Sequence, residues 1–275
     1  MKKLIFISFS VFLLISTNCF AQNCLSPFKN EKGKIDIAGG TAHIPVLKEA
    51  SQNIMKFNPD IRITIGGGGS GTGIKKLGEG LIDIGNSGRK PSKNEIEKYN
   101  LSMYRWAIDG VAIIVNKKNS ISNINTQTLQ KIFSGEITNW KTLGGENGSI
   151  NIYTRDEASG TREVFWKKAL LKENISQKAI FISSNGAMKT AVSKDENAIG
   201  YISIGHLDNN VKGVSLNKAY PDLENVKSGK YNVSRGLFSN TKGEAKGLNK
   251  KFIDYLYSED GQKIIKSKGF IPVER

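Results

Sequence analysis

The 275-residue sequence predicts an α/β fold from the order of its apolar segments and turns. Residues 61–65 (Ile-Arg-Ile-Thr-Ile) alternate apolar and polar side chains and are β-branched at every second position, which is typical of a strand. A glycine-rich turn at 66–73, a helical stretch at 74–79 and a second strand at 81–85 follow. Strand, turn, helix and strand in this order form the repeating unit of α/β proteins.

Helical spacing and short apolar runs predict the other elements in chain order. They are a strand at 35–38, a helix at 45–57, a strand at 106–115, a helix at 126–133, a strand at 150–153, a helix at 160–171, a strand at 198–202 and helices at 248–257 and 261–267. No internal repeat and no Pro- or Ser-rich linker divides the chain. Two lobes would therefore have to be joined by strands, as in hinged binding proteins.

The first residues are predicted to be a secretory signal peptide. Lys2 and Lys3 precede an apolar run at 4–15, which is shorter than the roughly 20 residues that a membrane-spanning helix needs. The predicted cut follows Ala21, giving a signal peptide over 1–21 and a loose leader over 22–33. Acylation of Cys19 is the alternative, with a poor sequence context. We expect a periplasmic or otherwise extracytoplasmic protein.

The composition limits the classes of ligand and of active site that the protein can have. The formal charge of +15 falls to +13 when Lys2 and Lys3 are removed, and this sign suits anionic ligands or surfaces. Basic residues are spread along the chain without a run of five, so we expect no nucleic-acid partner. Two His and two Cys are too few for a metal centre or a histidine-based active site, and no metal or cofactor is expected.

Glycines and small hydroxyl residues recur in four segments that precede predicted helices. These segments are Gly39–Ala42, Gly69–Gly73, Asn86–Arg89 and Ala158–Thr161. The N-terminus of a helix presents unpaired N–H groups and a partial positive charge, so it favours an anion. Arg155 lies four residues before Ser159 and could contact the same anion through charge-assisted hydrogen bonds.

Other motif interpretations are weaker. The glycine run at 66–71 matches a dinucleotide-binding pattern, but no acid follows about 20 residues later. An exported hydrolase using Ser70 or Ser159 would need His43 or His206 beside the serine as a base. A surface protein that binds polyanions through its charge would instead show salt-sensitive binding.

Seven motifs together resemble the periplasmic phosphate-binding proteins of the phosphate ABC importer, in particular their short-chain branch. The motifs are GGGSGTGIK (67–75), DIGNS (83–87), DGVA (109–112), GEITNW (135–140), RDEASGTR (155–162), AIGY (198–201) and GQKII with GFIPV (261–265 and 269–273). The resemblance implies two α/β lobes of the type II periplasmic binding protein fold, joined by two hinge strands, with phosphate in the cleft. It implies a first lobe of residues 34–112 and 235–275 and a second lobe of residues 113–234.

The resemblance also implies a set of phosphate-binding residues. They are Thr41, Ala42, Ser70, Thr72, Ser87, Arg89, Arg155, Ser159, Gly160 and Thr161. Glu157 is expected to orient Arg155. Other family members place an Asp where this sequence has Gly88, and this sequence has Gly40 and His43 where Ser and a small apolar residue are usual.

The expected function is capture of inorganic phosphate and its delivery to an ABC permease by a monomeric binding protein without catalytic residues. A binding protein for sulfate, molybdate or tungstate is the alternative within the same class. An exported serine hydrolase is the alternative from another class.

Overall fold

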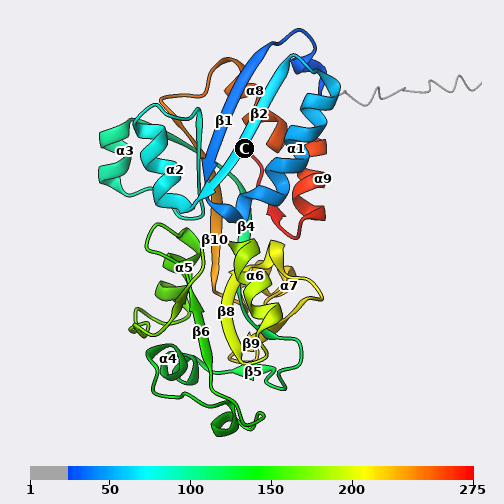
Figure 1. The fold of residues 1–275 in the computed structure, drawn as a ribbon. Helices are drawn as coiled ribbons and strands as arrows, with labels where there is room; N and C mark the ends of the chain where they lie inside the picture. Colours follow the sequence, from blue (N-terminus) through cyan, green and yellow to red (C-terminus); the bar gives the residue numbers. More distant parts are fainter. Residues whose placement is uncertain (1–23) are drawn as a thin grey trace, which may run out of the picture.

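The computed structural model describes residues 24–275, so the expected signal peptide over 1–21 and Cys19 lie outside the described residues. Two lobes lie one above the other and are joined by two long strands, β4 (Leu101–Asn116) and β10 (Ser234–Lys242) (Figure 1). These strands pair antiparallel, from Leu101 opposite Lys242 to Gly110 opposite Ser234. The predicted two-lobe α/β fold with two connecting strands is therefore confirmed.

The first lobe is the upper one in Figure 1 and holds both ends of the described chain. Its elements are η1 (Ser26–Phe28), β1 (Gly33–Gly39), η2 (Thr41–His43), α1 (Ile44–Phe57), β2 (Ile61–Gly68), α2 (Gly69–Gly78), β3 (Ile84–Ser87), α3 (Lys93–Tyr99), α8 (Gly247–Tyr257), α9 (Glu259–Ser267) and β11 (Ile271–Pro272). Strand β1 pairs in parallel with both β2 and β3. The carboxyl ends of these strands therefore meet at one edge, which faces the second lobe.

The second lobe is built from the middle of the chain. Its elements are β5 (Asn123–Ile124), α4 (Thr126–Ser134), η3 (Trp140–Leu143), β6 (Asn151–Thr154), α5 (Gly160–Lys168), β7 (Ile180–Phe181), α6 (Asn185–Lys194), β8 (Ala198–Ser203), η4 (Ile204–His206), β9 (Val211–Leu216) and α7 (Leu223–Lys227). One continuous sheet runs through both lobes in the order β2-β1-β3-β10-β4-β8-β6-β7. Among residues 24–275, no helix is both long and apolar enough to span a bilayer.

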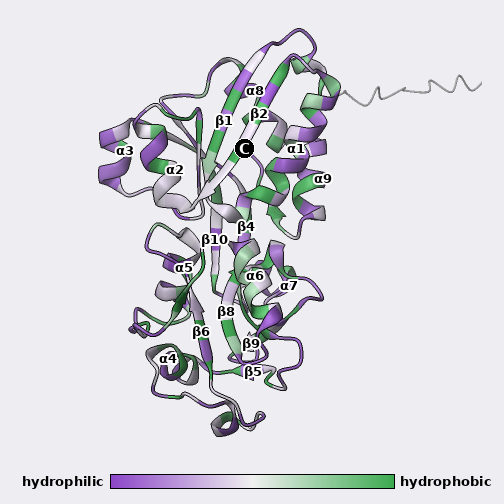
Figure 2. Ribbon diagram, viewed as in Figure 1, coloured by the Kyte–Doolittle hydropathy of each residue, from purple (hydrophilic) through white to green (hydrophobic). Residues whose placement is uncertain are grey.

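Each lobe has its own apolar core. The first cluster of buried side chains runs up to Ala107 and resumes at Leu237, and the second runs from Val111 to Val233. The chain therefore passes between the cores within 108–110 and 234–236, a few residues before the predicted boundary at 112. Figure 2 shows hydrophobic residues along β8, whereas α3, which buries no residue, is largely hydrophilic.

Burial explains why the strongest sequence signals were reliable. Residues 111–115 are fully buried in the core of the second lobe, where β4 lies between β8 and β9. Strand β2 alternates instead, with Ile61 and Ile63 buried and Arg62 and Thr64 exposed, since only one of its faces packs on the core.

Three local expectations are wrong. The leader is not loose over the described residues 24–33, because Phe28 is 1% exposed and packs edge-on against Tyr255. Helix α2 starts at Gly69 rather than at residue 74, so the glycine-rich segment forms its first turn. The strand expected at 81–85 starts at Ile84, and Leu81 is 65% exposed in the preceding turn.

Candidate anion-binding site between the lobes

A small pocket lies where the two lobes meet, with about 180 Å³ free of protein atoms. The pocket is lined by residues of both lobes and of β10, namely Gly40, Thr41, Ala42, His43, Gly69, Ser70, Gly88, Arg155, Ser159, Gly160, Thr161 and Arg235. Seven of the ten predicted site residues are brought together here: Thr41, Ala42, Ser70, Arg155, Ser159, Gly160 and Thr161.

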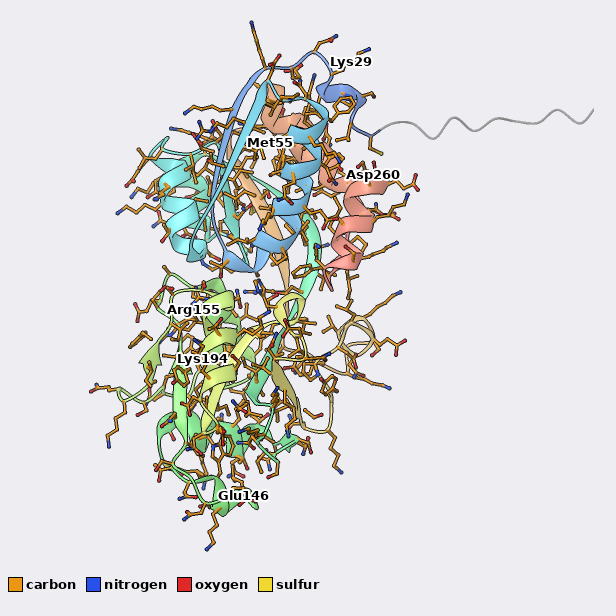
Figure 3. The ribbon with its side chains drawn as sticks, turned by 45° about the vertical axis from the view of Figure 1, so that its right-hand side comes forward. Lys29, Met55, Glu146, Arg155, Lys194 and Asp260 are labelled. Atoms are coloured by element: carbon orange, nitrogen blue, oxygen red, sulfur yellow. The ribbon has the colours of Figure 1, made fainter. Side chains whose placement is uncertain are left out.

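Arg155 supplies the charge of the second-lobe wall. It directly follows β6, is 1% exposed, and lies in the lower lobe close to its boundary with the upper one (Figure 3). Its Nη2 donates to the backbone carbonyl of Ser183 at 2.9 Å, while its buried Nε and Nη1 donate to no partner among residues 24–275. Burial lowers the pKa of Arg155. A buried cation with two unsatisfied donors is costly unless an anion fills the pocket.

Helix α5 adds hydrogen-bond donors beside this arginine. Ser159 is its N-cap residue, and the Ser159 Oγ accepts a hydrogen bond from the backbone N–H of Arg162 at 3.2 Å. Gly160 and Thr161 open the helix, where backbone N–H groups have no partner within the helix itself. The α5 N-terminus therefore presents N–H groups, hydroxyls and a positive dipole end to the pocket.

The first-lobe wall presents hydroxyl groups that are already acting as acceptors. Thr41 Oγ1 accepts from the backbone N and side-chain Nδ2 of Asn185 at 3.2 and 3.0 Å. Ser70 Oγ accepts from the backbone N–H of Gly88 at 2.9 Å. Because these oxygens already accept from the protein, their hydroxyl hydrogens are left to donate to a ligand.

Three predicted site residues lie outside the pocket. Thr72 packs against the backbone of Gly68, and Ser87 Oγ accepts from Asn240 Nδ2 at 3.0 Å. Arg89 makes two hydrogen bonds of 2.7 Å to Glu95 and a third contact of 3.0 Å to Glu163. All three residues come after the end of a predicted strand. Their side chains contact other parts of the chain, which the local sequence pattern does not identify.

The expected role of Glu157 is also not observed. Glu157 is exposed, and no ion pair joins it to Arg155 within residues 24–275. The guanidinium of Arg155 is instead held by the carbonyl of Ser183, and its backbone N–H donates to Tyr201 Oη at 3.0 Å.

Three residues in or next to the pocket were not among the predicted phosphate-binding residues, namely His43, Asn185 and Arg235. His43 is fully buried, with its two ring nitrogens 2.9 Å from the Gly40 carbonyl and 3.2 Å from the Ser87 carbonyl. Burial lowers the pKa of His43 to about 3, and the nearby Arg235 adds to this shift. A Cβ on residue 40 would lie 2.7 Å from the His43 ring, so the glycine at position 40 leaves room for this histidine.

The lobes contact each other around the pocket. The backbone N–H of Gly71 donates to the Ala158 carbonyl at 2.9 Å, and His206 Nε2 donates to the Thr41 carbonyl at 3.2 Å. Gly69 adopts a φ of +89°, and a Cβ there would lie 2.7 Å from the Ala158 oxygen, so glycine is required for this approach. Neither His43 nor His206 contacts a serine hydroxyl within residues 24–275, and the Ser–His pair of a hydrolase is not formed.

Two lobes joined by hinge strands around a small donor-lined pocket define a solute-binding protein for an anion. A family model described as a PBP superfamily domain matches residues 28–260. The phosphate-binding protein PstS of Bacillus subtilis (strain 168) is 36% identical over 99% of this chain and 94% of its own length. PstS of Borreliella burgdorferi is 33% identical over the full length of both chains.

A solved structure from Clostridium perfringens, named a phosphate ABC transporter substrate-binding protein and containing bound phosphate, superposes with a TM-score of 0.82 at 33% identity. It covers 88% of this chain and all of its own. The chain therefore belongs to the PBP superfamily and, within it, to the family of the phosphate-binding protein PstS.

Proposed function

We propose that this protein captures inorganic phosphate between its lobes and delivers it to the membrane permease of a phosphate ABC importer. The observation that carries the proposal is the buried Arg155 guanidinium, which has two N–H groups without an acceptor in a pocket lined by further donors. A phosphate ion supplies both the missing acceptors and the opposite charge. The relatives from B. subtilis and Borreliella, which are named for phosphate binding, support the same ligand.

Seven residues are proposed to hold the phosphate. They are Thr41, Ala42, Ser70, Arg155, Ser159, Gly160 and Thr161. Hydroxyl and backbone N–H donors arrive from both lobes, while Arg155 provides charge in a low-dielectric environment where hydrogen bonds to an anion are strong. The protein acts as a binding protein of its family and not as an enzyme, because the ligand is bound and released unchanged.

Closure of the lobes is the proposed means of capture and release. The proposed lobes are residues 34–112 with 235–275 and residues 113–234, except that Val111 and Ala112 pack in the core of the second lobe. The lobes move about β4 and β10. The ligand bridges walls that belong to different lobes, so it favours the closed arrangement by its differential affinity for it. Opening then exposes the phosphate to the permease.

The protein is proposed to act outside the cytoplasm. The signal peptide over 1–21 would direct the chain across the cytoplasmic membrane, leaving a monomeric extracytoplasmic protein with a charge of +13. That charge favours encounters with an anionic ligand.

Thermal melting with a panel of oxyanions tests the function, because a ligand that binds only the native state raises its stability. We expect phosphate to raise the melting temperature more than sulfate, molybdate or tungstate at equal concentration. Competition calorimetry should then show phosphate displacing sulfate. Displacement of phosphate by equimolar sulfate would contradict the choice of ligand, and turnover of a chromogenic phosphoester would favour the hydrolase alternative.

A further inference from the structure

A second arginine, Arg235, reaches the pocket from the connecting strand β10. It lies directly opposite Asp109 of β4, and its Nε and Nη2 donate to Asp109 Oδ2 at 2.9 and 2.8 Å. The side chains of Arg235 and Asp109 are 3% and 0% exposed. A buried ion pair thus lies where the chain crosses between the lobes, at the back of the pocket.

Asp109 is fixed in turn by the second lobe. Ser203 Oγ donates to Asp109 Oδ1 at 2.9 Å, and the backbone N–H of Ser203 donates to Asn185 Oδ1 at 2.9 Å. Asn185 then donates to Thr41 Oγ1 in the first-lobe wall at 3.0 Å. One chain of buried hydrogen bonds therefore links Arg235 to the opposite side of the pocket, so the position of its guanidinium is well determined.

The third nitrogen of Arg235 has no such partner. Its Nε and Nη2 both donate to Asp109. No hydrogen bond among residues 24–275 uses the remaining nitrogen, Nη1. Nη1 lies beside Gly88, because a Cβ built on residue 88 would be 2.7 Å from it. Arg235 and Gly88 both line the pocket. The absence of a side chain at residue 88 leaves room for this N–H group at the pocket wall.

We propose that Arg235 is a further anion-binding residue, whose Nη1 donates to the bound oxyanion from the hinge side while Asp109 holds the rest of the guanidinium. The inference rests on the proposed phosphate site. Asp109 compensates the charge of Arg235, so this group can be buried in the empty protein, whereas Arg155 pairs with no carboxylate of residues 24–275. The ligand then contacts both lobes and the strand that joins them.

The test measures phosphate affinity by calorimetry and the melting temperature without phosphate. Arg235→Gln should weaken phosphate binding at least tenfold. The double variant Asp109→Asn/Arg235→Gln removes both charges together, so it avoids leaving an unpaired buried carboxylate and decides the question if Arg235→Gln does not fold. It should show the same tenfold loss. An unchanged affinity in the double variant would overturn the proposal, whatever its melting temperature.

Two further variants separate a ligand contact from a structural role. Gly88→Ala keeps the ion pair but must displace Nη1, and we expect at least a threefold loss of affinity; wild-type affinity in this variant would count against the proposal. Arg105→Gln removes the same charge from an exposed position of β4 and should bind phosphate like the unmodified protein. Loss of binding in Arg155→Ala together with wild-type binding in the Arg235 variants would refute this inference alone. Normal binding in Arg155→Ala would refute the site itself.

Discussion

Arg155 and Arg89 lie at comparable places in the two lobes, and the structure gives them opposite roles. Each follows a short strand: Arg155 comes directly after β6, and Arg89 comes two residues after the end of β3. The guanidinium of Arg89 is held by Glu95 and Glu163. That of Arg155 is held by one carbonyl and keeps two buried nitrogens that find no partner in the described part of the chain, residues 24–275. Of these two arginines, only Arg155 keeps buried N–H groups that an anion can accept from.

The paired arginine also has a clear structural role. Glu95 belongs to the first lobe, where it also caps α3, and Glu163 belongs to α5 of the second lobe. The bidentate contact with Arg89 lowers the pKa of Glu95 to about 2. The Nε contact of Arg89 with Glu163 then crosses from one lobe to the other beside the pocket. Arg89 thus stabilises the closed arrangement without touching the site.

The largest effect is expected where the unpaired arginine is removed. Arg155→Ala should weaken phosphate binding at least a hundredfold, about 3 kcal/mol, because two charge-assisted hydrogen bonds to a buried anion are lost. Isothermal calorimetry measures this directly. Wild-type affinity in this variant would mean that the comparison of the two arginines is wrong.

We expect the stability of the protein to depend on pH through His206, a base that the fold largely buries. Burial lowers the pKa of His206 from 6.5 to about 4. Because the folded pKa is the lower one, the unfolded chain binds more protons between pH 4 and 6.5, so stability is full above pH 6.5 and falls as the pH drops toward 4. Between pH 7 and pH 5 this costs about 2 kcal/mol.

His206→Gln keeps a donor for the Thr41 carbonyl and removes the titration. Melting temperatures with saturating phosphate at pH 7 and pH 5 should therefore differ less in this variant than in the unmodified protein. An equal pH dependence in the two proteins would show that His206 is not held neutral by burial.

A smaller loss is expected for a neutral donor of the second-lobe wall. Ser159→Ala removes one hydroxyl from the pocket and should weaken phosphate binding about fivefold, about 1 kcal/mol. The same change also removes the α5 N-cap, so Ser258→Ala, which removes the N-cap of the remote helix α9, is the matched control. The control should lose stability but retain affinity, and equal affinities in both variants would argue against Ser159 as a ligand.

The smallest effect is expected for the paired arginine. Arg89→Ala and Glu163→Gln should each weaken phosphate binding only about twofold to fivefold, since a partly exposed ion pair contributes about 0.2–1 kcal/mol. High salt should reduce the difference from the unmodified protein. A loss in Arg89→Ala as large as that in Arg155→Ala would place Arg89 in the site and remove the contrast between the two arginines.

Much of the fold was predictable because its strongest signals are local. The alternation at 61–65 and the apolar run at 106–115 both mark strands that the structure contains. Strand β10 was missed because its sequence is largely polar, yet Ser239 and Asn240 are fully buried. Their side chains bond to β3 and to Trp106, partners that lie far away in the sequence. Periodicity does not detect polar residues that are buried by such pairing.

Some residues of the site were predictable from local sequence and others were not. The glycine and hydroxyl segments at the starts of α2 and α5 carry their chemistry in consecutive residues, and Ser70, Ser159 and Thr161 from these segments line the pocket. Asn185 and Arg235 carry no local signal for a ligand. Arg235 lines the pocket because β10 passes beside it, and Asn185 of α6 bonds to the lining residue Thr41.

The amino-acid sequence by itself determined the α/β class, the helix starts rich in donors and the segment that contains Arg155, because these depend on neighbours along the chain. Only the tertiary structure decided which arginine stays unpaired, since Glu95, Glu163 and Asp109 reach their partners through folding. The N–H groups available to a ligand are those that the protein's own acceptors leave unused. That remainder is a property of the folded molecule.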